Sequence, residues 1–448
     1  MTPEELSSLE RRHVWHPFTQ MRDWEAGEPL FIESGDGVKL RDIHGREYYD
    51  GNSSLWVNVH GHRHPALDAA VQAQLGKLAH STMLGLTHPL AAELAARLVR
   101  IAPTGLQRVF YSDSGSEAVE IALKMTYQYW RHRGQEQRSR YIGLSEGYHG
   151  DTVGAVSIGG IPLFHGIFRR LLFEAHFAPC PAQFSTAEEA AEGMEALLRE
   201  HGDTVAAVVV EPLIQGAGGM LVHPRGYLRR VRELCDRYGT LLIVDEVATG
   251  FGRTGRMFAC EHEEVSPDLM CVAKGITGGY LPLAATLTTE EIYSAFLGDF
   301  AERKTFYHGH SYTGNPLACA AAVANLEIFE RERVIDGLAP KIDRVREGLR
   351  RFRELPHVAE IRQCGLMIGI ELAADPARGE PYPWQEAVGA RVCMRARELG
   401  MITRPLGDVV IFMPPLASTE ADLDAMLEIL YRAIRLETEG DGAGPGAA

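Results

Sequence analysis

Two short apolar runs, residues 205–210 and 241–244, constrain the fold of this chain more than any other feature. Both are rich in β-branched residues, and each is followed by a carboxylate, which is typical of parallel strands buried on both faces. Residues 227–238, between them, have a helical pattern. These segments predict a βαβ unit whose carboxylates lie at the carboxyl edge of a parallel sheet.

A strand–loop–helix unit precedes this pair. The strand-like residues 108–111 lead through a loop of small residues, 112–116, into a helical pattern with apolar residues on one face. Alternation of strands and helices continues over about residues 60–325. It predicts an α/β fold in which helices cover both faces of a mainly parallel sheet.

The carboxyl-terminal part of the chain has a different pattern. A long Ala-rich helix is predicted at residues 316–329. Helical and strand-like segments then follow in mixed order, at residues 366–372, 392–399, 409–413 and 419–436. We therefore predict a large α/β domain over residues 61–325 and a smaller α+β domain over residues 1–60 and 326–438. The Gly-rich residues 439–448 are predicted to form a disordered tail.

The charge of the chain disfavours polyanionic partners. Its 45 Lys and Arg residues against 60 Asp and Glu give a formal net charge of −15, which argues against binding to nucleic acid or anionic lipid. No apolar run approaches the roughly 18 residues that would span a bilayer. The start of the chain is acidic, and Thr2 and Pro3 are typical of a capped helix rather than of a secretory leader. We expect a cytoplasmic protein with small-molecule partners.

The sequence does not indicate a metal site. Seven scattered cysteines include no C-x-x-C pair, so neither a disulfide framework nor a thiolate zinc site is predicted. Residues 60–64 read His-Gly-His-Arg-His, but no Cys or carboxylate completes a ligand set at suitable spacing. We expect these histidines to have structural roles.

The strongest chemical signal is a trio in which two carboxylates at the ends of predicted strands, Glu211 and Asp245, precede Lys274. Ligands of open α/β sheets bind beyond the carboxyl ends of the strands, where Asp245 would be held rigidly and could pair with a protonated pyridine nitrogen. A partly desolvated lysine amine can form a Schiff base with an aldehyde. Single lysines are usually solvated surface residues, but the trio favours a reactive Lys274 over that alternative.

Two loops could complete a cofactor site. Ser114 and Glu117 have capping-box spacing at a helix start, where the backbone N–H groups of Gly115 and Ser116 could bind a phosphate; a plain helix cap is the alternative. Tyr148, framed by two glycines, could stack on a flat cofactor or pack in the core. The glycine fingerprint of a nicotinamide site is absent.

These residues belong to ordered blocks in which the chain resembles the fold-type I, class III pyridoxal-phosphate (PLP) aminotransferases. The blocks are residues 111–118, 147–151, 211–212, 244–255 and 273–275. The resemblance extends over nearly the entire chain. It implies the fold-type I architecture, in which the large, mainly parallel-sheet α/β domain binds PLP and the smaller domain is α+β.

The resemblance assigns roles at the cofactor. Lys274 would be the catalytic residue and form the Schiff base with PLP, and Asp245 would pair with its ring nitrogen. Tyr148 would cover the ring, and Gly115 and Ser116 would hold the phosphate.

The resemblance also implies a homodimer whose active sites lie at the subunit interface. The segment Gly309-His310-Ser311 would reach the cofactor of the neighbouring subunit, where Ser311 would donate to the phosphate. Glu211 is implied as an organiser near the cofactor rather than as the base.

Four further segments are similar to family members that convert 8-amino-7-oxononanoate to 7,8-diaminononanoate in biotin biosynthesis. They are residues 15–21, 53–56, 248–250 and 403–407. Arg404 then matches the arginine that binds the carboxylate of the keto acid. The alternatives are another ω-aminotransferase, acting on an ornithine derivative, 4-aminobutyrate or a diamine, and, more remotely, a non-catalytic PLP-binding regulator. The implied substrate contacts are Phe18, Leu55, Trp56, Arg253, Gly309 and Arg404.

The amino donor is open between S-adenosylmethionine and lysine. Members that use S-adenosylmethionine tend to have Tyr in place of Phe18, a second Trp in place of Leu55 and Pro-Thr in place of His310-Ser311. Phe18 and Leu55 remove a hydroxyl and an indole face that would contact a sulfonium, and the chain is more similar to a subgroup with lysine as the proposed donor. Asp151 and Arg253, which resemble residues that shape the donor site, are retained and support S-adenosylmethionine.

Overall fold

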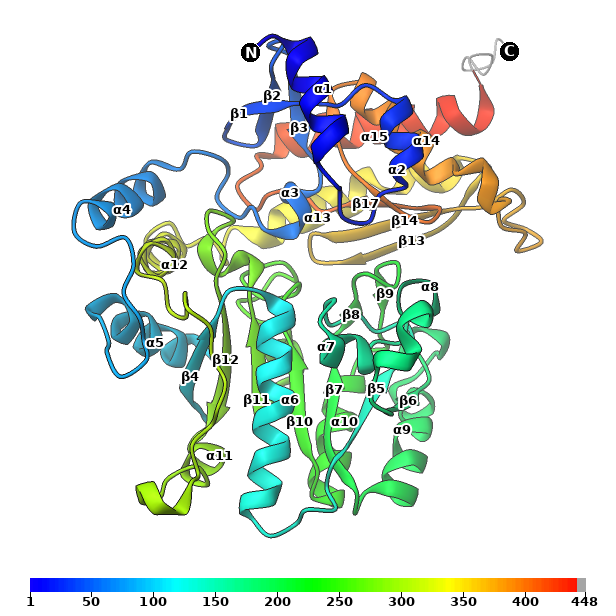
Figure 1. The fold of residues 1–448 in the computed structure, drawn as a ribbon. Coiled ribbons are helices and arrows are strands. Elements are labelled where there is room, and N and C mark those ends of the chain that lie inside the picture. The colour runs from blue at the N-terminus through cyan, green and yellow to red at the C-terminus, as the bar shows by residue number, and fades with distance from the viewer. Residues whose placement is uncertain (441–448) are drawn as a thin grey trace.

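The computed structural model describes residues 1–440, with a seven-stranded sheet at its centre (Figure 1). The strand order is β4-β12-β11-β10-β7-β5-β6. Strand β12 is antiparallel to both of its neighbours, and the other adjacent pairs are parallel. The predicted mainly parallel sheet is therefore confirmed. The strands are β4 (Leu106–Ser112), β5 (Arg140–Leu144), β6 (His176–Ala178), β7 (Val205–Val210), β10 (Leu241–Asp245), β11 (Leu269–Val272) and β12 (Ala284–Thr289).

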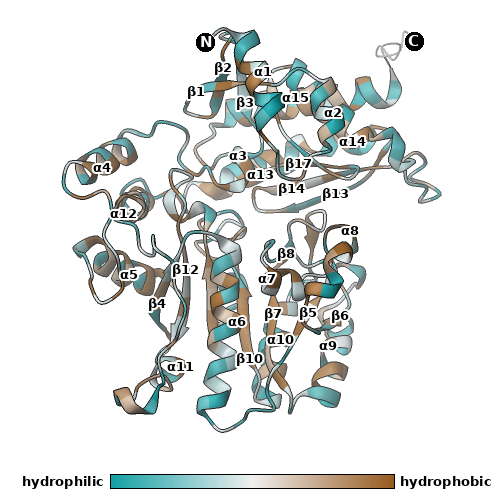
Figure 2. Ribbon diagram, in the orientation of Figure 1, coloured by the Kyte–Doolittle hydropathy of each residue, from teal (hydrophilic) through white to brown (hydrophobic). Residues whose placement is uncertain are grey.

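Both faces of this sheet are covered, because successive side chains of a strand point to opposite faces. Along β7, Val208 and Val210 pack in one apolar cluster with residues of α9 (Ala187–His201) and α10 (Tyr227–Tyr238). Ala207 and Val209 pack in another with residues of α6 (Gly115–His132). Figure 2 shows the hydrophobic residues concentrated on the central strands and polar residues on the outer faces of the helices.

The two ends of the chain form the smaller part of the molecule together. One sheet, of order β1-β2-β3-β15, joins N-terminal strands to a C-terminal one, and a second has the order β13-β14-β17-β16. Figure 1 shows both sheets beyond the carboxyl edge of the central sheet. The strands are β1 (Ile32–Asp36), β2 (Lys39–Asp42), β3 (Glu47–Asp50), β13 (Val358–Cys364), β14 (Met367–Leu372), β15 (Met401–Ile402), β16 (Pro405–Leu406) and β17 (Val409–Phe412).

The remaining elements connect or cover these sheets. They are α1 (Pro3–His13), α2 (Met21–Ala26), α3 (Ser53–Trp56), α4 (Pro65–Leu75), α5 (Pro89–Ile101), α7 (Val153–Ser157), α8 (Pro162–His165), α11 (Glu290–Ser294), α12 (Pro316–Arg331), α13 (Leu338–Gly348), α14 (Val388–Glu398), α15 (Glu420–Glu439), β8 (Ile214–Gln215) and β9 (Leu221–Val222). Among the helices of residues 1–440, none is long and apolar enough to cross a membrane.

Several predicted boundaries differ from the structure. Helix α12 runs unbroken from Pro316 to Arg331, so the predicted division between residues 325 and 326 falls inside a helix. Helix α15 continues to Glu439, the first residue of the predicted tail, and residues 441–448 lie outside the described residues. The helix start at Thr2 is confirmed, because Thr2 and Glu5 form a capping box.

Candidate functional site

A cavity of about 690 Å³ lies at the carboxyl ends of the central strands, a size typical of small-molecule sites. Eight residues that the sequence singled out line it: Trp56, Gly115, Ser116, Tyr148, Asp151, Glu211, Asp245 and Lys274. They come from five separate stretches of the large sheet region and from α3. The structure therefore brings the predicted cofactor residues of one chain together.

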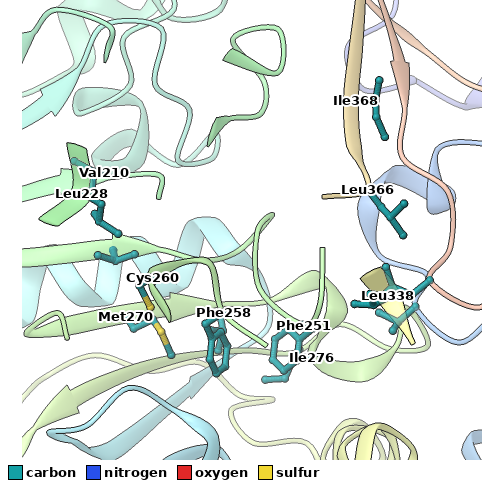
Figure 3. Close-up of a cluster of buried hydrophobic side chains, with 14 of the residues drawn as sticks. Val210, Leu228, Phe251, Phe258, Cys260, Met270, Ile276, Leu338, Leu366 and Ile368 are labelled. Carbon is teal, nitrogen blue, oxygen red and sulfur yellow. The ribbon is translucent and has the colours of Figure 1, made fainter. Parts of the chain in front are cut away.

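Lys274 follows the end of β11 and is held by core packing behind it. Its neighbour Gly275 packs closely on Phe251, since a Cβ at Gly275 would lie 2.9 Å from Cβ of Phe251. Figure 3 shows Phe251 beside Ile276 in the buried cluster. Burial lowers the pKa of the Lys274 amine, although Asp245 and Glu211 act in the opposite direction. A lowered pKa increases the fraction of unprotonated, nucleophilic amine.

Asp245, the last residue of β10, forms a buried pair with His149. Its Oδ2 atom lies 2.8 Å from His149 Nδ1, and its Oδ1 accepts from the Val247 N–H at 3.0 Å. Burial lowers the pKa of His149, but the hydrogen bond to Asp245 and the charges of Asp245 and Glu211 together outweigh it and raise the pKa overall. Asp245 is thus fixed in orientation, with its carboxylate on the wall of the cavity.

Glu211 joins two loops beneath the cavity. Its carboxylate accepts hydrogen bonds from the backbone N–H of Tyr148 at 3.0 Å and of Gly216 at 2.9 Å. Burial raises the pKa of Glu211 to about 7. Its two backbone partners support the role of an organiser.

The first turn of α6 is shaped to receive an anion. Ser114 and Glu117 form a capping box, which uses the N–H groups of Asp113, Ser114 and Glu117. The N–H groups of Gly115 and Ser116 lie too early in the helix to have intrahelical acceptors. A Cβ at Gly115 would lie 2.6 Å from Cγ1 of Val247, so only glycine fits at this position.

Three predicted substrate contacts lie near the cavity without lining it. Phe18 is 60% exposed, and its ring packs edge-on against Phe164 with centroids 5.6 Å apart. Leu55 is 47% exposed. Arg404 follows β15 and is half-buried near Tyr148, and burial lowers the pKa of its guanidinium. That guanidinium has no hydrogen bond or ion pair with another residue of the described chain.

Arg253 lies behind the cavity. It is buried, and its guanidinium donates to the carbonyl oxygens of Pro414 at 2.8 Å and of Asn58 at 2.7 Å. Burial lowers the pKa of Arg253 to about 10. The side chain does not line the cavity and two of its five N–H groups are bound to backbone carbonyls, so the arrangement favours a structural role.

Gly309, His310 and Ser311 form a loop beside the start of α6, outside the cavity of their own chain. The Nδ1 atom of His310 lies 3.5 Å from Asp113 Oδ2, and Ser311 is exposed. Ser311 does not line the cavity of its own chain, whereas Gly115 and Ser116 do.

Sequence reasoning missed two residues that shape the cavity. His149 lies in the block at residues 147–151 and was given no role of its own, although it pairs with Asp245 across 96 residues. Thr152 donates its N–H to Ser116 Oγ at 3.0 Å, and the two hydroxyls lie 2.7 Å apart. The proximity of both to Tyr148 in the chain is the only signal that could have found them.

Comparisons with known proteins agree with this geometry. A family model described as "Aminotransferase class-III" matches residues 21–434. Relatives named adenosylmethionine-8-amino-7-oxononanoate aminotransferase include that of Anoxybacillus flavithermus, 56% identical over 96% of this chain and 97% of the relative, and that of Aquifex aeolicus, 52% identical over 98% and 99%. The chain belongs to the class III aminotransferases.

Solved structures give the same result. The crystal structure of the enzyme of that name from Methanocaldococcus jannaschii superposes with a TM-score of 0.95 at 46% identity, over 97% of this chain and 99% of the other. An (S)-enantioselective omega-transaminase from Thermomicrobium roseum superposes with a TM-score of 0.93 at 34% identity, over 98% and 99%. The fold alone therefore does not distinguish between substrates within the family.

Proposed function

We propose that this protein binds PLP and transfers an amino group to 8-amino-7-oxononanoate, which gives 7,8-diaminononanoate. The observation that carries the proposal is the placement of the Lys274 amine, the Asp245–His149 pair and the first turn of α6 around one cavity. The names of relatives at 52–56% identity support the substrate.

The residues present fit PLP. Gly115 and Ser116 would hold its phosphate with N–H groups that the helix leaves free, and Asp245 would accept a hydrogen bond from its protonated ring nitrogen. Tyr148 would lie against the ring. Bound PLP supplies an aldehyde that captures amines and a ring that stores electrons.

The reaction requires a base at the donor carbon and an anchor for the acceptor. Lys274 Nζ, with its lowered pKa, would take a proton from the carbon that carries the amino group and would later return a proton at C7 of the keto acid. The unpaired guanidinium of Arg404 would bind the far carboxylate of the acid in a bidentate geometry. A long, flexible substrate would thus be fixed at both ends.

S-adenosylmethionine and lysine are both proposed donors. The relatives' name favours the first. The exposed Phe18 and Leu55, which lack a hydroxyl and an indole, favour the second.

A second copy of the chain would complete the site. Two loops in contact beside the cavity, joined by the His80 and Tyr312 rings with centroids 4.7 Å apart, carry exposed apolar side chains. These are Leu84, Leu86, Tyr307 and Tyr312. Clustered exposed apolar groups are typical of a protein interface, and we propose a homodimer in which Ser311 approaches the partner's first turn of α6.

A single-turnover experiment tests the function. Enzyme in the pyridoxamine form is mixed with 8-amino-7-oxononanoate, and return of the pyridoxal absorbance is followed together with formation of 7,8-diaminononanoate. Rapid return is expected. No return, together with rapid return on pyruvate or 2-oxoglutarate, would overturn the substrate and leave a general ω-aminotransferase.

A further inference from the structure

Four consecutive residues beside the cavity adopt a left-handed backbone. The φ angles of Ser53, Ser54, Leu55 and Trp56 are 46°, 50°, 76° and 69°. L-residues rarely adopt this conformation, and non-glycine residues do so as single positions rather than as a run. Such strain persists only where the surrounding structure over-determines it, and it is concentrated at functional sites.

These four residues, named α3 (Ser53–Trp56) above, form a left-handed turn. Asp50, the last residue of β3, holds this turn. Its Oδ1 accepts from the Ser54 N–H at 2.8 Å, and its Oδ2 accepts from the Ser54 hydroxyl at 2.7 Å. His62 lies with Nε2 3.0 Å from the same Oδ2. Asp50 is 1% exposed, so its carboxylate is shielded from water although its partner Ser54 is exposed, and a buried carboxylate requires such hydrogen bonds. This contact also accounts for one histidine of the cluster at residues 60–64.

The segment after β17 holds the turn at a second point. The Ser53 hydroxyl donates to the Met413 carbonyl at 2.6 Å, and the Met413 N–H donates to the Gly51 carbonyl at 2.9 Å. Turn residues are therefore tied both to the N-terminal sheet and to the segment that follows β17.

The turn directs the Trp56 ring at Lys274. Trp56 Nε1 donates to Asn52 Oδ1 at 3.0 Å, which fixes the rotation of the ring. One edge of the indole packs on Gly216, where a Cβ would lie 3.1 Å from Cζ3. The Lys274 Nζ atom lies 4.8 Å from the ring centroid, within the range of a cation–π contact.

We propose that Asp50, supported by His62, is a positioning residue that acts through Trp56 on the Lys274 amine. Its carboxylate holds the left-handed turn, the turn holds the indole face against Nζ, and the face stabilises the ammonium form of Lys274 whenever this amine is free. The proposal rests on the proposed function, because it takes Lys274 as the reactive amine.

Other charges that act on Lys274 stay constant in the test. Asp245 and Glu211 favour its ammonium form, and Arg253 disfavours it. None of the substitutions below replaces these three groups. Asp50 also acts on Arg253 and raises its pKa, so Trp56→Leu, which leaves Asp50 in place, is the variant whose change in titration reports on the ring alone.

The experiment measures the reactivity of Lys274 against pH in the full-length enzyme loaded with pyridoxamine phosphate, in which this amine is free. Acetic anhydride labelling of the Lys274 peptide is quantified by mass spectrometry and normalised to its plateau at high pH, which removes differences in reagent access. For Trp56→Leu we expect the normalised labelling rate, at pH values below the midpoint of the wild-type profile, to rise about three- to tenfold. Loss of the cation–π contact favours the neutral amine.

The Asp50 variants separate positioning from folding. Asp50→Asn should change the profile in the same direction, and the double variant Asp50→Asn/Trp56→Leu should change it no further than Trp56→Leu alone. The matched control is Asp42→Asn, because Asp42 is a buried carboxylate of the same sheet that binds Arg46 and Tyr48 instead. It should leave the profile unchanged.

Two results would overturn the proposal: equal shifts in Asp50→Asn and Asp42→Asn, or additive shifts in the double variant. If Asp50→Asn fails to fold, Ser54→Ala replaces it. This variant removes one hydrogen bond to Asp50 and keeps the other, and it should shift the labelling profile in the same direction. The labelling is repeated on the chain without cofactor. A protein that takes up no PLP would contradict the proposed function, whereas the profiles would still decide the role of Asp50.

Discussion

The imidazole of His149 and the carboxylate of Asp245 form a buried pair with Nδ1 and Oδ2 2.8 Å apart. The pair links the loop after β5 to the end of β10, two neighbours of β7 in the central sheet. Glu211, at the end of β7, completes a cluster of three ionisable side chains under the cavity. The charges of this cluster have consequences for stability as well as for catalysis.

Glu211 should make stability pH-dependent. Burial raises its pKa from 4.5 to about 7, so between these values the folded state binds more protons than the unfolded state and stability falls as pH rises. The stability of the wild type relative to Glu211→Gln should therefore fall by about 3 kcal/mol from about pH 4 to about pH 8. Denaturant unfolding at several pH values measures it.

The control for Glu211 is Glu188→Gln, at an exposed position of α9. It should leave the pH dependence of unfolding as in the wild type. A constant difference between wild type and Glu211→Gln over the whole range would show that Glu211 is ionised like an exposed carboxyl.

Replacing Lys274 by Ala should lower turnover by about 10⁴-fold or more, because both covalent capture of PLP and proton transfer are lost. The absorbance band of covalently attached PLP should disappear, while PLP still binds. Lys341→Ala is the control, since Lys341 is a partly buried lysine that donates to the Leu416 carbonyl, and neither residue lines the cavity. Unimpaired turnover of Lys274→Ala would refute its role.

Arg404 should bind the carboxylate of the keto acid. We expect Arg404→Met to lower kcat/KM for 8-amino-7-oxononanoate by about 10- to 100-fold, the range of a charge-assisted hydrogen bond. The methyl ester of the substrate provides the discriminating measurement. Wild type and Arg404→Met should have equally low kcat/KM for the ester. If the substitution lowers kcat/KM by a similar factor for acid and ester, Arg404 has a structural role.

Two substitutions test the donor. Leu55→Trp and Phe18→Tyr restore an indole face and a hydroxyl at exposed positions. If the missing indole and hydroxyl determine donor choice, the double variant Leu55→Trp/Phe18→Tyr should raise kcat/KM for S-adenosylmethionine relative to that for lysine by about two- to thirtyfold. Steady-state rates with each donor give the ratio, and an unchanged ratio would assign donor choice to other residues.

Mixed dimers test whether Ser311 acts on the neighbouring subunit. Lys274→Ala and Ser311→Glu homodimers should both be nearly inactive, the latter because a carboxylate would face the phosphate. If Ser311 acts in trans, a heterodimer of the two variants has one site free of both defects, and activity should return to about half of the wild-type value per dimer. Activity no higher than that of the two homodimers would mean that Ser311 serves its own chain.

The sequence predicted the central elements well because their physical signals are local. Strand β7 and helix α10 have the predicted bounds, since a strand buried on both faces forms one continuous apolar run and a helix packed on a sheet keeps a single apolar stripe. Asp245 was predictable for the same reason, because it ends such a strand. Lys274, two residues after β11, was predicted from its place after the two carboxylates rather than from that strand.

Features that depend on distant contacts were not predictable. The His149–Asp245 pair joins residues 96 positions apart, and Arg253 binds carbonyls of two other segments. Strands of two residues, such as β8, are too short to show a period. The left-handed turn contains no glycine, and the carboxylate bonded to it, Asp50, lies outside the turn itself.

That turn also limits how Leu55 can change during evolution or in a designed library. At a φ of 76°, β-branched side chains are strongly disfavoured, whereas Asn, Asp and Gly adopt the conformation most readily. Val, Ile and Thr should therefore be rare among active variants at position 55, whatever shape the donor requires. The backbone selects the usable amino acids at this position before the substrate does.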